Sequence, residues 1–368
     1  MPHDLIIVGA GLAGLALARA MTSRGKDVLV LEARPRIGGR VLSHRTAAGC
    51  YDLGPAWIWP TLQPRIARML EATGLDVYAQ AEEGGFIYQD AQGNVQRLAN
   101  GFPQVPPSSR LRGGIEALVA AIGAQCRPDG IRLQTQVRGI GLNREGVDVT
   151  AQGPEGPITL RAKRVALALP PRLLGGIELS PKLPAALSNR LDQVPTWMAG
   201  HAKALAIYHR PRWRDDSLSG SSISRCGPLA ELHDASLPAA SEAALFGFFG
   251  WNALQREFHR ANLKEQVVAQ LRLLFGPAAG APREVVIQDW AFEPWTSTAA
   301  DGVAGGAHPD YRPVPLPEPW KHRLLLSGSE AAPEFAGYLE GALASAEVAA
   351  TWACSDGAGL GHRADSAK

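Results

Sequence analysis

Residues 4–34, DLIIVGAGLAGLALARAMTSRGKDVLVLEAR, restrict the fold of this chain more than any other segment. Leu5–Val8 is a short apolar run, typical of a strand buried inside a parallel sheet. A glycine-rich loop follows it, and an apolar helix is predicted from Leu12 to about Arg24. A second strand is predicted over residues 27–31. Strand, loop, helix and strand in this order predict a Rossmann-like α/β unit.

The loop has the spacing that a bound dinucleotide requires. Gly9 allows a tight turn, Gly11 lets the backbone approach a pyrophosphate, and Gly14 lets the helix pack closely on the strand. The helix N-terminus offers free N–H groups to the phosphates. Glu32 ends the second strand, where a carboxylate accepts hydrogen bonds from two ribose hydroxyls and would repel a 2′-phosphate. GxGxxG alone is weak evidence in a chain with 40 glycines, but in this context it predicts a dinucleotide site.

The composition is that of a globular protein with more than one domain. The 368 residues are 46% hydrophobic and 20% charged, and the formal net charge is +2. This balance of charge favours neither nucleic acid nor an anionic membrane as a partner. The four cysteines are scattered, no signal peptide precedes the first strand, and no apolar run is long enough to span a bilayer. We therefore expect a cytoplasmic protein with no membrane anchor, disulfide framework or structural metal.

A second glycine pair lies in ARPRIGGRVLS, residues 33–43. Gly38 and Gly39 followed by Arg40 could bring backbone and a fixed positive charge to the same pyrophosphate from its other side. The alternative is a surface turn with an exposed arginine.

These motifs resemble the flavin-containing amine oxidase family, which includes monoamine and polyamine oxidases, L-amino-acid oxidases and lysine-specific histone demethylases. The chain is most similar to short, bacterial-type members. The resemblance continues through YDLGPAWIWP (51–60), whose family counterpart runs beside the flavin ring, and through the C-terminal run at 324–350. It implies FAD as the cofactor. The residues it assigns to FAD are Gly9, Gly11, Ala13, Gly14, Glu32, Ala33, Arg34, Gly38, Gly39, Arg40, Gly54, Pro55, Ala56, Trp57, Val137, Trp290, Glu330, Tyr338 and Leu339.

Some of these assignments are specific. By resemblance, Val137 closes on the adenine and Glu330 reaches the ribitol end of FAD. Tyr338 flanks the substrate face of the flavin, and Leu339 lies at the flavin edge. Without the resemblance, residues 336–353 indicate only a closely packed helix of small residues, with Tyr338 in the core.

The stretch GHAKALAIYHRPRW, residues 200–213, predicts a strand with an unusual lysine. Alternation places Lys203 on the same face as Leu205 and Ile207, with alanines on the other face. From spacing alone, Lys203 is either a rim residue that reaches water or a cation kept inside for chemistry. The segment resembles the family strand whose lysine reaches flavin N5 through a water. We therefore interpret Lys203 as a cation that stabilises negative charge on the flavin or on oxygen.

The resemblance also sets the expected architecture. We expect an α/β fold in which a Rossmann-like FAD-binding domain is discontinuous, formed by residues 1–78, 109–177 and 291–354. A mixed α+β substrate domain is expected from residues 79–108 and 178–290, and a disordered tail from 355–368. Only about thirty residues fill a position where larger family members insert a helical lobe, so the active site is expected to be more open.

A second departure concerns DWAFEPWTSTAADGV, residues 289–303. Ala299 stands where covalent members carry the cysteine that binds flavin, and Ala300 stands where an aromatic completes a cage around the substrate. FAD is therefore predicted to be non-covalent. Tyr338 lacks its usual partner, and the tryptophans at 251, 290 and 295 are either a replacement wall or core residues.

The leading hypothesis is an FAD-dependent oxidoreductase that oxidises the C–N bond of a small amine. Hydride passes to flavin N5, and O₂ reoxidises the flavin to give H₂O₂. We assign catalytic positions to Lys203, Tyr338 and Trp295. The alternative is an FAD-dependent oxidase, desaturase or isomerase that acts on a non-amine substrate such as a reduced nicotinamide isomer. A non-catalytic, FAD-stabilised binding domain is disfavoured by Lys203. The sequence names neither the substrate nor the oligomeric state.

Overall fold

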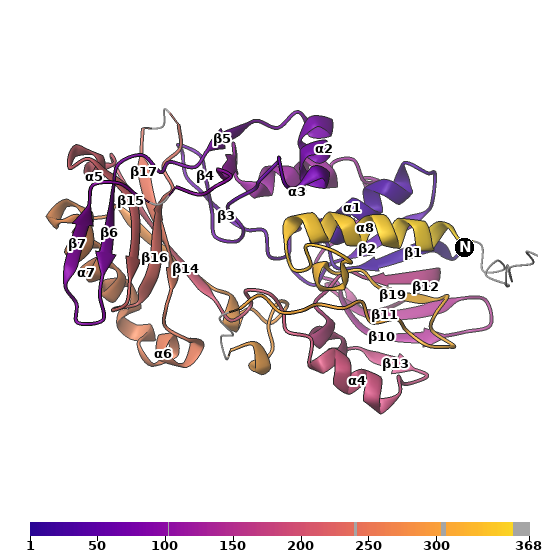
Figure 1. Ribbon diagram of the computed structural model, residues 1–368. Helices are drawn as coiled ribbons and strands as arrows, with labels where there is room; N and C mark the ends of the chain where they lie inside the picture. The colour runs from indigo at the N-terminus through magenta and orange to yellow at the C-terminus, as the bar shows by residue number, and fades with distance from the viewer. Residues whose placement is uncertain (102, 239–240, 303–306, 356–368) are drawn as a thin grey trace, which may run out of the picture.

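The computed structural model describes residues 1–101, 103–238, 241–302 and 307–355. The predicted disordered tail, apart from Ser355, lies outside the described residues. The chain forms two lobes, each built on one large β-sheet, and the polypeptide passes between them several times (Figure 1). Two small two-stranded sheets complete the strands that the structure describes.

The first sheet has eight strands and the parallel centre that the sequence predicts. Its order is β13-β10-β11-β12-β1-β2-β9, with β19 also paired to β12. The bounds are β1 His3–Val8, β2 Val28–Leu31, β9 Ile131–Arg132, β10 Gln136–Leu142, β11 Val147–Gly153, β12 Gly156–Leu167, β13 Glu178–Ser180 and β19 Leu324–Leu326. β1 is parallel to both β2 and β12. Its apolar residues are buried on both faces, because one face packs against helices and the other shares a core with residues of β10 and β11.

Helices α1 (Leu12–Thr22) and α8 (Leu339–Cys354) lie side by side on this sheet (Figure 1). Both helices contribute several alanines to the core that they share, and small side chains let helix backbones approach closely. Helices α2 (Pro64–Thr73) and α3 (Ile115–Gly123) pack against the same core. α1 ends at Thr22, slightly before the predicted end, and Gly25 then adopts a positive φ of 72°.

The second sheet has seven strands in the order β18-β14-β17-β16-β15-β6-β7. Their bounds are β6 Gly85–Gln89, β7 Val95–Leu98, β14 Ala202–Tyr208, β15 Leu218–Ser224, β16 Leu229–Asp234, β17 Ala243–Phe249 and β18 Glu284–Asp289. Its outer face is covered by α7 (Leu263–Phe275), and the short helices α5 (Arg212–Asp215) and α6 (Ala253–Phe258) lie beside it. The small sheets pair β3 (Ser43–Arg45) with β4 (Cys50–Asp52), and β5 (Val77–Ala79) with β8 (Ser109–Leu111).

The alternation expected in β14 is present. Its alanines pack with α7 in the outer core, whereas Leu205 and Ile207 pack with Tyr51 and Leu53 on the face toward the first lobe. Lys203 is on that inner face and is 2% exposed. The rim interpretation of Lys203 is therefore wrong, because β14 is an internal strand between β18 and β17 and its inner face packs on Tyr51 and Leu53.

The second sheet collects its strands from the two segments expected to form the substrate domain. Residues 178–192 were expected in the substrate domain but pack with the first sheet. β13 pairs with β10 of that sheet, and α4 (Ala185–Asp192) packs its Leu191 into the core of that sheet. We therefore propose that the dinucleotide-binding unit continues to Asp192 and that the second domain begins after α4.

The tight contact between β1 and α1 generates a prediction. A Cβ added at Gly14 would lie 2.0 Å from the Gly9 carbonyl oxygen. Gly14→Ala should therefore shift helix from strand and cost about 1–3 kcal/mol, as overpacking does. The midpoint temperature of thermal unfolding and the ratio of bound flavin to protein should both fall. Gly141→Ala is the control, because its Cβ would meet Ser180 at an ordinary 3.9–4.0 Å. Equal behaviour of the two variants would contradict the prediction.

Candidate active site

A cavity of about 1060 Å³ lies between the two sheets and is lined by residues of both. Boundaries between domains are common places for ligand sites. The predicted site residues that line it are Gly9, Gly11, Ala13, Glu32, Ala33, Arg34, Gly38, Gly39, Arg40, Gly54, Pro55, Ala56, Trp57, Val137, Lys203, Trp290, Trp295, Tyr338 and Leu339. Gly14 lies behind the loop and packs helix on strand, and Glu330 lies behind Arg40. Most of the site residues predicted from the sequence therefore line this one cavity.

One end of the cavity has the shape of a backbone cradle. Gly9 has a φ of 106°, and a Cβ there would lie 2.5 Å from the Ala168 carbonyl oxygen. The two glycine turns lie back to back, with the Gly38 N–H donating to the Ala10 carbonyl at 2.8 Å. No side chain caps the first turn of α1, so its N–H groups are free to bind a phosphate. The cradle therefore fits the pyrophosphate of a dinucleotide.

Glu32 is positioned by backbone N–H groups of the first glycine loop and of the segment that follows β2. Its carboxylate accepts the N–H of Ala10 at 2.8 Å and the N–H of Arg34 at 2.9 Å. The side chain is 3% exposed yet borders the cavity. An ionised carboxylate has about four lone-pair sites, so two acceptor sites remain for ribose hydroxyls. The arrangement fits the predicted role.

Arg34 contacts residues of the 293–296 segment, which also borders the cavity. Its guanidinium donates to Thr296 Oγ1 at 2.8 Å and lies 3.5 Å from both Glu32 and Glu293. Its Nε is buried without a hydrogen-bond partner among the described residues. An orphaned donor of this kind beside a cavity is a position for a ligand acceptor.

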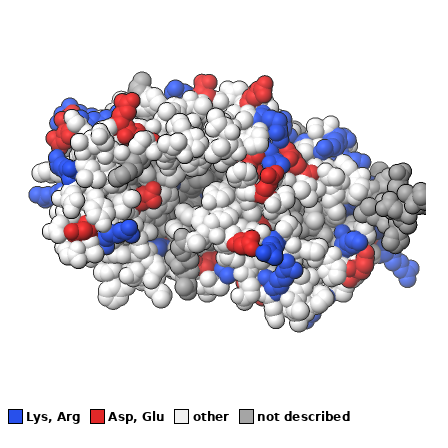
Figure 2. Space-filling model, viewed as in Figure 1, with Lys and Arg blue, Asp and Glu red and all other residues white. Residues whose placement is uncertain are grey.

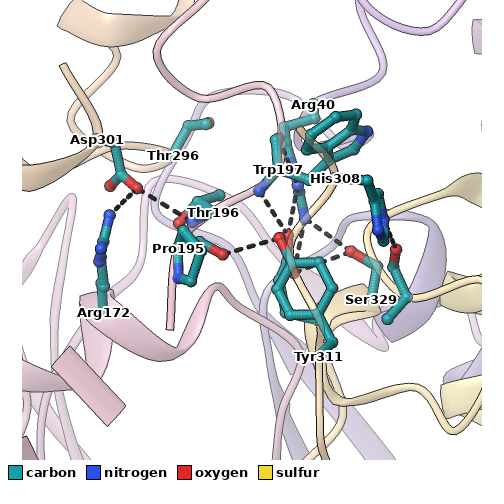
Figure 3. Close-up of polar contacts among 12 residues, drawn as sticks. Arg40, Arg172, Pro195, Thr196, Trp197, Thr296, Asp301, His308, Tyr311 and Ser329 are labelled. Carbon is teal, nitrogen blue, oxygen red and sulfur yellow. Dashed lines mark hydrogen bonds and ion pairs between the residues drawn. The ribbon is translucent and has the colours of Figure 1, made fainter. Parts of the chain in front are cut away.

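Arg40 and Glu330 form an ion pair in which the carboxylate is buried and the guanidinium is partly exposed. The two nitrogens of Arg40 contact the Glu330 carboxylate at 2.6 and 2.9 Å, and Arg40 also donates to Ser329 Oγ and to the Trp197 carbonyl (Figure 3). Burial acts to lower the pKa of Arg40, but Glu330 outweighs it and raises that pKa. Both carboxylate oxygens of Glu330 are engaged by Arg40 and Ser329, and its contact with the ribitol stays a prediction.

Lys203 borders the cavity from β14 of the second sheet. Its Nζ donates to the carbonyl oxygens of Gly54 at 2.6 Å and Asp52 at 3.2 Å. It also lies 4.6 and 5.1 Å from the ring centres of Phe246 and Phe248. Burial lowers the pKa of Lys203 to about 7, while the nearby Asp52 carboxylate acts in the other direction. Lys203 is therefore a group that titrates near neutrality beside the 52–57 segment.

The structure supplies a second aromatic wall that the sequence did not reveal. Trp197 lines the cavity 6.0 Å from Tyr338 between ring centres, at 53°. Its backbone is held between Arg40 and Glu330, and the Tyr311 hydroxyl donates to the neighbouring Pro195 carbonyl (Figure 3). Gly337 is needed there because a Cβ would lie 2.8 Å from the Trp197 Cβ. A tryptophan in the proline-flanked stretch QVPTWMAG was the only available signal.

Segment 289–302 closes the cavity from the side of the second sheet. The Trp290 Nε1 donates to the Leu53 carbonyl at 3.2 Å, and Trp295 borders the cavity. Ala299 and Ala300 lie in a short 3₁₀ turn, Ala299–Asp301, outside the lining. Asp301 is paired with Arg172 and accepts the Thr196 N–H at 3.0 Å, which anchors the turn (Figure 3). Trp251 is not a wall, because it stacks on His259 away from the cavity.

Comparison with known proteins identifies the family. The family model for flavin containing amine oxidoreductases matches residues 79–352, and a model for NAD(P)-binding Rossmann-like domains matches residues 7–73. The chain belongs to the flavin-containing amine oxidoreductase family. Putrescine oxidase of Kocuria rosea is 24% identical over 421 aligned positions, covering 83% of this chain and 86% of that protein. Amine oxidase B of Homo sapiens is 23% identical, covering 94% and 85%.

Solved structures show the same fold. Putrescine oxidase bound to putrescine superposes with a TM-score of 0.77 at 22% identity, covering 95% of this chain and 98% of that one. Cyclohexylamine oxidase from Brevibacterium oxydans gives a TM-score of 0.78 at 20% identity, covering 96% and 99%. These results confirm the predicted fold and FAD as the cofactor, and the chain is an FAD-dependent oxidoreductase.

The part of the chain that the structure describes has neither a membrane-spanning helix nor a cluster of metal-binding side chains. None of its helices has the length and hydropathy to cross a bilayer. No group of three or more histidine, cysteine or acidic side chains there could hold a metal ion. On the face shown in Figure 2, positive and negative side chains are interspersed, without a large patch of one sign.

Glu32 provides the test of the nucleotide end. Glu32→Ala removes the acceptor for two backbone N–H groups and for the ribose, a loss of about 1–3 kcal/mol. FAD affinity should fall about tenfold or more, measured by flavin fluorescence on reconstitution of the apoprotein. Glu155→Ala, in an exposed turn, should leave affinity unchanged. Unaltered affinity in Glu32→Ala would show that the carboxylate does not contact the ribose.

Proposed function

We propose that this FAD-dependent enzyme oxidises the C–N bond of an amine to an imine, which water hydrolyses. When bound, FAD accepts the hydride at N5 and passes the electrons to O₂, giving H₂O₂. The observation that carries the proposal is the buried Lys203 beside the 52–57 segment, in the same cavity as a dinucleotide cradle. Membership of the family, and relatives named for amine oxidation, support the same reaction.

The cofactor would be held along the length of the cavity by the residues already described. The Gly9–Gly14 loop and the Gly38–Gly39 turn would receive the pyrophosphate, with Glu32 at the ribose. Gly54 to Trp57 would lie beside the flavin ring, within reach of Lys203. With Ala299 in the position of the family's cysteine, no thiol is available there for a covalent bond, so FAD is non-covalent.

The walls beyond Lys203 are suited to positioning an apolar amine. Tyr338 and Trp197 form one side, and Phe248 and Trp295 border the same cavity. Aromatic faces at this site exclude water and favour the neutral amine, the form that can release hydride from its α-carbon. The role of these residues is to hold the α-C–H bond in place, which requires no acid–base dyad. Tyr338 is 40% exposed and is therefore not the core residue that spacing alone suggests.

Lys203 would supply electrostatic assistance. Its ammonium is fixed by the Gly54 and Asp52 carbonyls and by two aromatic faces, so it needs no reorganisation when negative charge develops nearby. Its lowered pKa means that it also gives up a proton readily at neutral pH.

The reaction is tested on the purified yellow protein. Heat or acid should release FAD, and anaerobic mixing with a panel of primary and secondary amines should bleach the flavin, followed by stoichiometric H₂O₂ on admission of O₂. Flavin that stays with the denatured chain would refute non-covalent binding. Bleaching by reduced nicotinamide isomers and by no amine would refute amine oxidation.

Lys203→Met keeps the apolar stem and removes the charge. FAD should stay bound, while reduction by amine, reoxidation by O₂, or both slow by one to two decades, about 1.4–2.8 kcal/mol of barrier. Because the pKa is lowered to about 7, the protonated form is lost as pH rises through that value, and reoxidation should slow over the same range. Rapid-mixing kinetics measure each half-reaction. The pH dependence should vanish in Lys203→Met and persist in Lys264→Met, an exposed control on α7.

A further inference from the structure

Tyr338 borders the cavity, but few contacts fix its ring. It is the N-cap residue of α8 and follows a turn in which Phe335 and Gly337 have positive φ values of 51° and 82°. Its side chain is 40% exposed, and its hydroxyl group has no hydrogen-bond partner among the described residues. The position of this ring therefore depends largely on the neighbouring rings.

His308 provides the closest of these ring contacts. Its imidazole stacks on Tyr338 with the ring centres 5.0 Å apart and the planes 12° from parallel. The same imidazole meets Trp197 edge-on, with the ring centres 4.7 Å apart. Trp197 and Tyr338 are 6.0 Å apart, so each of them is closer to His308 than to the other. His308 is thus the ring that joins the two aromatic walls.

His308 is itself held in place. Its Nε2 lies 2.8 Å from the carbonyl oxygen of Ala336 (Figure 3), and because a carbonyl only accepts, Nε2 carries the hydrogen. Tyr311, three residues further along the chain, packs edge-on against His308 at 5.4 Å, and its hydroxyl donates to the Pro195 carbonyl at 2.9 Å. This short segment therefore contacts both the turn before α8 and the loop that carries Trp197.

The stacking determines which part of Tyr338 a ligand can contact. His308 is not among the described residues that line the cavity. Ring centres 5.0 Å apart leave no space for a ligand between the two rings, because it would need about 3.5 Å on each side. A substrate in the cavity can therefore contact only the other face or the edge of Tyr338, and His308 can act on it only through that ring.

We propose that His308 is a positioning residue of the substrate site, which fixes the ring of Tyr338 beside Trp197 so that its free face contacts the amine. Trp197 needs this contact less, because its backbone is already held by Arg40 and Glu330. A wall that is ordered before the substrate arrives loses less side-chain entropy on binding and holds the reacting bond in place. This inference rests on the proposed amine oxidation and adds a residue that acts on the amine without touching it.

The test is a double-mutant cycle on the holoenzyme, measured by anaerobic rapid mixing with an amine that reduces the wild-type flavin. His308→Ala should lower the second-order rate of flavin reduction three- to tenfold, the range expected for loss of one aromatic pair. In a Tyr338→Ala background the same substitution should change that rate by less than about twofold, because the ring that His308 positions is absent. FAD affinity should be unchanged by His308→Ala.

Two further variants separate the ring from the hydrogen bond. His308→Phe keeps a ring that can stack, whereas His308→Gln keeps an N–H donor for the Ala336 carbonyl without a ring. His308→Phe should retain most of the wild-type rate, and His308→Gln should be as slow as His308→Ala. This pair carries the test if His308→Ala does not fold. His259→Ala is the matched control, because His259 also stacks on a tryptophan, Trp251 at 4.6 Å, outside the described cavity lining. It should behave as wild type.

Three results would overturn the role of His308 while amine oxidation stands. They are an equal loss from His308→Ala with and without Tyr338, a wild-type rate in His308→Gln, and a loss of bound FAD that accounts for the slower reduction. If no amine reduces the flavin of the wild-type protein, the proposed function itself is refuted, and the role of His308 with it.

Discussion

The arrangement of the two lobes depends on one buried ammonium group. Lys203 comes from β14 of the second sheet, but its hydrogen bonds go to carbonyls of Asp52 and Gly54 in a segment that belongs to the first lobe. Removing a charge from water costs several kcal/mol unless its donors are satisfied. Two carbonyl oxygens and the faces of Phe246 and Phe248 meet that requirement here. Burial of this group at the cavity wall nevertheless lowers the pKa of Lys203 to about 7.

A second polar contact joins the cofactor cradle to the substrate wall. Arg40 follows the Gly38–Gly39 turn, and its guanidinium holds Glu330 and the Trp197 carbonyl together. Glu330 also accepts the Trp197 N–H at 3.4 Å, so both polar groups of that residue's backbone are engaged. Trp197 in turn borders the space beside Tyr338. A cofactor that engages Arg40 would thus stabilise the position of one aromatic wall.

Local patterns in the sequence predicted the elements but not all of the partners. The GxGxxG loop and Glu32 are close along the chain, so their spacing was sufficient to predict a dinucleotide site. The alternation in β14 correctly separated Lys203 from the alanines, but only the packing of the first lobe decided that its face is buried. Glu330 was assigned to FAD by resemblance, and its ion pair with Arg40 was not predicted because the two residues are 290 positions apart in the chain. Trp197 was missed because no local periodicity marks a residue in an irregular loop.

The sequence by itself determined the α/β fold, the dinucleotide loop and the family, because each depends on motifs whose residues are near one another in the chain. Only the tertiary structure decided which side chains share the cavity. Trp197 and Tyr338 are more than a hundred residues apart in the chain, yet their rings are neighbours. Glu231 of β16 and Lys203 of β14 both pair with Phe248 of β17, so they lie on the same face of the second sheet. Strand order and register arise from long-range hydrogen bonds and from burial of one face of each strand. Those contacts, rather than local propensity, determine the chemistry that faces the substrate.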